Sequence, residues 1–321
     1  MNYSKIGSFE AIALIIVVIL NHIVLNLPKN LIDSCGSSTP LNVIFISILL
    51  FIFLYFVLRI FNKFKGNDIL DIAEFLGGKV LKTIIGILFI VYFLIICSTQ
   101  LRNFCEILNV VYFLKIPISF LVLTFLVVAI TANIFGQRSI IKCNLIIVPL
   151  VMLNLIIAFF CIANRFVPQR IFPIFGYGID KTFFSGMSNI FAFTGISYIY
   201  LIQPMLKDTN DFKKISFIAM IISSLYVFVS VISLVLSFAD ILTINEISPI
   251  YILVRGANWG RFIQRPDAIF FFRMDSLSYV LFKHYYNVYY KNIEKNWKFI
   301  FSIITCLCNR LFNICYCFAS Y

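Results

Sequence analysis

The stretch FFSGMSNIFAFTGISYIYLIQP, Phe183 to Pro204, is apolar enough to lie in a bilayer, but its middle carries small and hydroxylated residues. Thr194, Gly195 and Ser197 stand where a simple membrane anchor needs only apolar side chains. A helix that unwinds in a membrane frees backbone groups that require another partner, because no water is present. The sequence therefore predicts a transmembrane helix that is interrupted here, at the centre of a solute-binding site.

The composition places the chain among polytopic all-α membrane proteins. Of its 321 residues, 61% are hydrophobic and 12% are charged, whereas soluble domains are about half apolar and about a quarter charged. The net charge of +12 would suit nucleic acid in a soluble protein. In a membrane protein, basic loops set the orientation instead, so the lipid bilayer is the expected partner and nucleic acid is not.

One transmembrane domain is expected over residues 1–321, because no loop is long enough to hold a core of its own. A span needs about 20 mostly apolar residues. Nine segments fit: 9–27, 41–60, 83–101, 117–135, 140–163, 184–204, 215–238, 267–282 and 299–318. Between the second and third, an amphipathic helix is expected, with Asp68 as N-cap and Gly77-Gly78 at its end.

The basic residues predict that the N-terminus is cytoplasmic. With that orientation, fifteen Lys and Arg fall on the cytoplasmic side and nine on the opposite side, in agreement with the positive-inside rule.

The first span carries a second interruption, at Asn21 and His22 before Pro28. It lies five spans before the interruption in the sixth, and transporters with inverted repeats bind solute at discontinuous helices in corresponding positions. Half-helix ends attract carboxylates and unwound carbonyls accept from ammonium groups, which suits an amino acid. The candidate ligand-binding residues are Thr194, Gly195, Ile196 and Ser197, facing Asn21, His22 and Ile23, with Thr99 along the pathway.

Structural explanations of the same residues stay open. Gly195 would also allow two helices to pack closely, and Thr194 and Ser197 would also bond back to their own helix.

No enzyme motif is present: the chain lacks a nucleotide-binding loop, a GxSxG elbow and an HExxH helix. The nine cysteines do not combine with the two histidines, His22 and His284, in a zinc-site spacing. The sequence therefore predicts no catalytic residue, no metal site and no cofactor.

Several segments together resemble the permease-like B subunits of spore germinant receptors, within the amino acid–polyamine–organocation transporter superfamily. They are LNLPKNL (Leu25–Leu31), DILDIAEFLGGKVLKTIIGILFIVYFL (Asp68–Leu94), LKIPISFLVL (Leu114–Leu123), IFGQRSIIKCN (Ile134–Asn144), IFAFTGISYIYLIQPMLKD (Ile190–Asp208) and WGRFIQRPDAIFFF (Trp259–Phe272). The resemblance implies a five-plus-five inverted-repeat transporter fold, here with about nine spans. It also implies sensing of a small germinant, often an amino acid, at the inner membrane of the spore, together with an A-type membrane subunit and a C-type lipoprotein.

The sequence departs from that family in three places. Ser197 stands where an acidic residue is often found, and Arg265, Pro266 and Asp267 form a changed version of an Arg–acid pair. The family usually has ten spans, and residues 273–321 are atypical, as in a frameshifted or truncated product. Two other functional interpretations therefore remain: an amino-acid permease that works by alternating access, and an inactive truncated remnant.

Overall fold

The computed structural model describes residues 5–24, 27–111, 113–134 and 137–237. This part of the chain is almost entirely helical and contains no strand, apart from one isolated bridge. The elements are α1 Ser8–Val24, α2 Leu27–Cys35, η1 Gly36–Ser38, α3 Thr39–Phe61, α4 Ile69–Val111, α5 Ile118–Ile134, α6 Gln137–Ile162, η2 Ala163–Arg165, η3 Pro168–Ile171, α7 Ile179–Phe183, η4 Ser185–Tyr198, α8 Ile199–Ile202, η5 Gln203–Met205 and α9 Phe212–Ser237. The expectation of an all-α fold is confirmed.

Three helical segments are long and apolar enough to cross a membrane: Leu31–Phe61, Ile69–Val110 and Phe212–Ser237. Shorter apolar helical stretches occupy Ser8–Leu20, Ile118–Val127 and Asn144–Ile157. The expected spans 267–282 and 299–318, and the atypical segment 273–321, lie outside the described residues.

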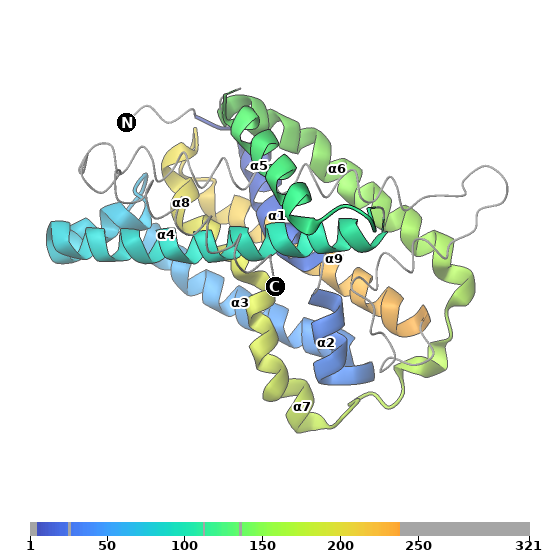
Figure 1. The fold of residues 1–321 in the computed structure, drawn as a ribbon. Helices are drawn as coiled ribbons and strands as arrows, with labels where there is room; N and C mark the ends of the chain where they lie inside the picture. Colours follow the sequence, from blue (N-terminus) through green and yellow to red (C-terminus); the bar gives the residue numbers. More distant parts are fainter. Residues whose placement is uncertain (1–4, 25–26, 112, 135–136, 238–321) are drawn as a thin grey trace.

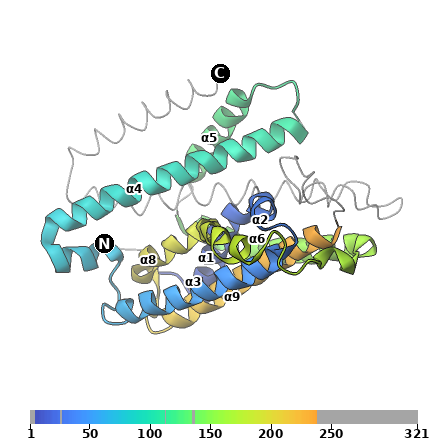
Figure 2. The same cartoon turned by 90° about the horizontal axis from the view of Figure 1, so that it is seen from below.

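Helix α1 is the centre of the fold. Its residues from Ala13 to Leu20 are at most 5% exposed, as expected for a helix that is apolar on every side. It packs against η4, α9 and α6, and α9 also packs against α3. Figure 2 shows α4 and α5 together on one side of the molecule and the helices around α1 on the other. This arrangement brings the middle of α1 against the stretch of sequence around Gly195.

The segment before α1 is joined to the loop between η5 and α9. The backbone N–H of Ile6 donates to Met205 O at 2.9 Å, and Lys207 N–H donates to Ile6 O at 3.0 Å. The Ser8 hydroxyl donates to the Asp211 carboxylate at 3.0 Å. The start of α1, the end of the sixth predicted span and the start of α9 therefore lie at one end of the bundle (Figure 1).

The expected amphipathic helix forms the start of α4, and its cap is confirmed. The Asp68 carboxylate accepts from the N–H of Asp71 at 2.8 Å, which satisfies one free donor of the first turn. Gly78 has φ +69°, a conformation that L side chains rarely adopt. The helix direction therefore changes at the Gly77-Gly78 pair, as the sequence predicts.

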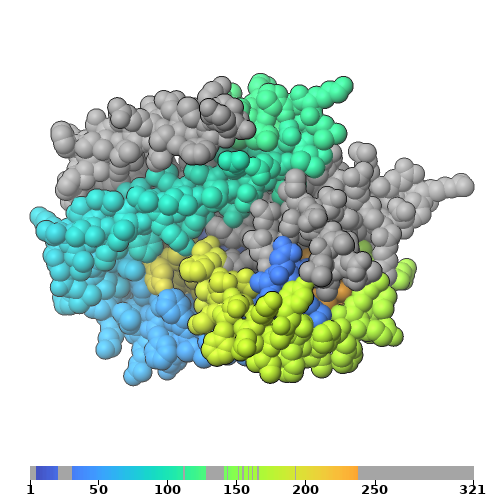
Figure 3. Space-filling view, turned by 60° about the horizontal axis from the view of Figure 1, so that its bottom comes forward, coloured from blue at the N-terminus to red at the C-terminus, as the bar shows by residue number. Residues whose placement is uncertain are grey.

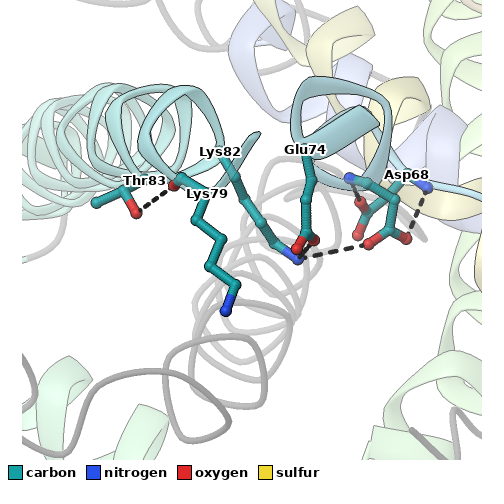
Figure 4. A network of polar contacts seen from close by, with 6 residues as sticks. Asp68, Glu74, Lys79, Lys82 and Thr83 are labelled. Carbon is teal, nitrogen blue, oxygen red and sulfur yellow. Dashed lines mark hydrogen bonds and ion pairs between the residues drawn. The ribbon is translucent and has the colours of Figure 1, made fainter. Parts of the chain in front are cut away.

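Lys82 connects the two sides of this kink. Its ammonium lies 2.6 Å from the Glu74 carboxylate and 3.7 Å from that of Asp71, as Figure 4 shows. Asp68 itself is only 2% exposed. Burial, and secondarily the charge of Asp71, raise the pKa of the Asp68 carboxyl from 3.8 to about 6.

Candidate functional site

The interrupted segment has 3₁₀ geometry on both sides of a kink. η4, Ser185–Tyr198, consists of two 3₁₀ stretches joined at Phe193, and 3₁₀ geometry in the middle of a helix often marks a hinge or strain. Its backbone leaves helical geometry at Phe193, with φ −94° and ψ 25°. The irregularity therefore lies directly before Thr194, next to the residues that the sequence singled out.

Gly195 lies against the backbone of α1. A Cβ atom added to Gly195 would stand 2.6 Å from Val18 O and 2.7 Å from the Cα of Ile19. These separations are shorter than real Cβ atoms show. The absence of a side chain at Gly195 thus lets the two backbones touch, which is the close-packing role considered above.

The Thr194 carbonyl collects two hydrogen bonds at the irregular turn. Ser197 donates its hydroxyl to this oxygen at 2.7 Å, and Tyr92 of α4 donates to it at 3.1 Å. Ser197 therefore bonds back to its own segment in this structure. Tyr92 was not among the predicted residues, because a tyrosine in an apolar helix gives no sign of which carbonyl it will reach.

Asn21, His22 and Ile23 belong to the last turns of α1, whose helical backbone continues to Val24. A separate helix, α2, begins at Leu27, and residues 25–26 lie outside the described residues. The described end of the first helix is thus just after these three residues rather than at Asn21 and His22. They follow Ile19, which contacts Gly195, by about one helical turn.

Thr99 is not brought to the other candidates. Its side chain is exposed on α4, and its hydroxyl donates to the carbonyls of Ile95 and Ile96 at 2.9 Å each. Tyr92, two turns earlier on the same helix, is the α4 residue that reaches the irregular turn.

Comparison with known proteins shows which family the chain belongs to. The profile of the Spore germination protein family matches residues 5–319. The chain belongs to this family. It is 22% identical over 222 residues to Spore germination protein B2 of Bacillus subtilis (strain 168), a match that covers 69% of this chain and 60% of that protein. It is 24% identical over 225 residues to Spore germination protein KB of the same organism, covering 68% and 60% respectively.

The chain thus spans about 60% of the length of the curated relatives that it matches. Membership of the Spore germination protein family, together with the three apolar helices, makes this an integral membrane protein.

A second polar group lies in the first half of η4, before the irregular turn. Asn189 donates to the Ser34 hydroxyl at 2.9 Å and to Asn42 Oδ1 at 3.2 Å. Asn42 Nδ2 donates to Thr182 O at 2.7 Å, and the hydroxyls of Thr182 and Ser38 lie 2.8 Å apart. We call these five residues the α3–α7 polar cluster. Asn189 therefore joins η4 to α2 and α3.

The cluster holds α7 and the first half of η4 against α2, η1 and α3. In the space-filling view, the yellow-green segment that contains α7 lies beside the blue α2 and α3 on one face (Figure 3). Asn42 is completely buried, so loss of its partners would leave polar groups without water.

We expect Asn42→Leu to destabilise the protein by about 2 kcal/mol, because one substitution removes both a donor and an acceptor between helices. Thermal unfolding in detergent measures the loss. Ser47→Ala is the matched control on α3, since the Ser47 hydroxyl bonds only to its own helix, at Val43 O. A double-mutant cycle with Asn189→Leu should show coupling, and additive effects would contradict the described contact.

Proposed function

We propose that the protein is a germinant-sensing, transporter-like subunit of a spore germination receptor. It binds a small zwitterionic solute such as an amino acid between the end of α1 and the irregular turn of η4. The single observation that supports this most is the kink at Phe193, where the backbone of η4 leaves helical geometry between two 3₁₀ stretches. It lies beside Gly195, which packs against the middle of the buried helix α1. Membership of the Spore germination protein family gives the biological setting.

In this proposal, Thr194, Gly195, Ile196 and Ser197 supply backbone groups and hydroxyls. Asn21, His22 and Ile23, in the last turns of α1, would line the opposite side of the site. Thr99, which is exposed on α4, would belong to the access route outside it. The Thr194 carbonyl accepts hydrogen bonds from the hydroxyls of Tyr92 and Ser197. An ammonium group that replaced Tyr92 as a donor would loosen the contact between α4 and η4. Solute would then favour one packing of the helices over the other, as a ligand-driven switch requires.

The expected assembly follows from the same family. The fold would be the five-plus-five inverted repeat, with the N-terminus in the cytoplasm and the chain in the inner membrane of the spore. An A-type membrane subunit and a C-type lipoprotein would complete the receptor.

The test is a germination assay of a strain that lacks the gene and is complemented by this reading frame, challenged with a panel of amino acids and sugars. Thr194→Val keeps the side-chain shape but removes the hydroxyl. We expect it to raise the germinant concentration for half-maximal germination about tenfold, as for one lost hydrogen bond. Ser188→Ala is the control, because Ser188 is exposed in the same helix and bonds only locally, to Ser185 O.

An unchanged response of Thr194→Val would count against the site. Failure of the unaltered frame to complement would instead favour the truncated remnant. Solute uptake into vesicles by the protein alone would favour the permease.

A further inference from the structure

A groove opens between the end of α3 and the start of α9, away from the proposed solute site. Its lining consists of Tyr55 and Arg59 from α3, Asn62 directly after the end of α3, and Lys213 from α9. Tyr55, Arg59 and Asn62 are spaced at i, i+4 and i+7, and Asn62 keeps helical backbone angles, so the three share one helix face. Stacking of Phe51 on Phe217, with ring centroids 6.2 Å apart, holds the two helices side by side at this level.

The same face of α3 changes character along its length. One and two turns before Tyr55 it carries Ile52 and Ile48, and before them Ile44, with exposed fractions of 51%, 52% and 44%. Along a transmembrane helix that leaves the hydrocarbon layer, exposed aliphatic side chains are typically followed by an interfacial Tyr and then by a basic residue such as Arg. The groove therefore lies at the headgroup level, at the end of a surface suited to acyl chains.

The groove holds two positive charges, those of Arg59 and Lys213. Neither forms an ion pair with any residue that the structure describes. The Lys213 ammonium lies 5.7 Å from the centre of the Tyr55 ring, so the aromatic ring helps to position it over the groove. Two cations from different helices, fixed by helix packing, form a site for an anion that both can reach.

We propose that this groove binds the phosphate of an anionic phospholipid, with the acyl chains lying along the Ile44–Ile48–Ile52 face of α3. The guanidinium of Arg59 offers paired donors to phosphate oxygens, and Lys213 adds a second charge. The Asn62 amide supplies a neutral donor beside them. Basic pockets between transmembrane helices are a known recognition mode for such headgroups, and the adjoining apolar face favours a lipid over free phosphate.

The experiment uses the 321-residue protein and its variants in nanodiscs. The nanodiscs are made of phosphatidylcholine that contains increasing fractions of phosphatidylglycerol. The readout is the number of phosphatidylglycerol molecules that each protein retains after mild detergent extraction, counted by native mass spectrometry. We expect Arg59→Gln with Lys213→Gln to raise the phosphatidylglycerol fraction for half-maximal retention about tenfold. The melting temperature in phosphatidylcholine alone reports folding, and the single variant Lys213→Gln carries the test if the double variant is unstable.

The matched control is Lys63→Gln with Lys214→Gln. It removes the same charge from the same two helix ends, and both lysines are exposed and outside the groove. If the two double variants lost equal amounts of retained phosphatidylglycerol, the effect would be one of general surface charge, and the proposal would be overturned. Retention unchanged in Arg59→Gln with Lys213→Gln would also overturn it. If soluble glycerol phosphate, at concentrations similar to that of phosphatidylglycerol, displaced the retained lipid, the site would be assigned to free phosphate instead.

Discussion

Gly195→Leu is expected to destabilise the protein by about 3 kcal/mol or more, at the upper end of the usual cost of overpacking. A Cβ at this position meets the carbonyl of Val18 and the Cα of Ile19. These are backbone atoms of a buried helix, so no side chain can rotate away to relieve the clash. Either α1 or η4 must move. Thermal unfolding of the purified protein in detergent measures the effect.

The size of the new side chain should matter less than its presence. Gly195→Ala already introduces the clashing Cβ atom, so it should destabilise the protein nearly as much as Gly195→Leu does. Gly86→Ala is the control, because the atom nearest to the added Cβ would be Leu70 Cδ2, at 3.8 Å. It should not destabilise the protein, since alanine is favoured over glycine in a helix by about 1 kcal/mol. A Gly195→Ala variant as stable as the unaltered protein would contradict the described contact between α1 and η4.

The stability of the protein should fall as pH rises from about 4 to about 6, through the titration of Asp68. The pKa of this carboxyl is raised from 3.8 to about 6 in the folded protein, first by burial and then by the charge of Asp71. The folded state therefore holds more protons than the unfolded state in this window, and stability decreases as pH increases. The shift corresponds to about 3 kcal/mol, fully present below pH 4 and lost above pH 6.

Asp68→Asn should remove this dependence while keeping the side-chain oxygen that caps α4. The variant should be more stable than the unaltered protein at pH 7 by up to about 3 kcal/mol, and little different at pH 4. Unfolding measured in detergent across this range provides the comparison. Asp33→Asn, at an exposed position on α2, serves as the control. A pH profile that Asp68→Asn leaves unaltered would show that another group is responsible.

Much of the local architecture was predictable because it depends on neighbours in the chain. The cap at Asp68 and the kink at Gly77-Gly78 follow from a side chain that reaches its own first turn and from a glycine with φ +69°. The irregularity of the sixth segment was expected beside Gly195, and it occurs at Phe193. Each of these features arises within a few residues.

The candidate site was less predictable because its contacts join distant parts of the chain. Nothing in the residues near Tyr92 indicates that its hydroxyl reaches Thr194 O. Likewise, nothing in the residues near Asn189 indicates that its amide reaches Ser34 and Asn42, about 150 residues earlier in the chain. Hydrogen-bond partners across helices depend on rotation and register, which a single helical pattern leaves open.

The sequence by itself determined that this is a helical membrane protein with an irregular segment around Gly195, since apolar run length and small residues act locally. Only the tertiary structure decided what Gly195 touches. The middle of α1 lies against it closely enough to exclude a side chain, and Ser197 turns back to the Thr194 carbonyl. The reason is physical: the packing of α1 against η4 depends on the complementary surfaces of two segments more than 170 residues apart.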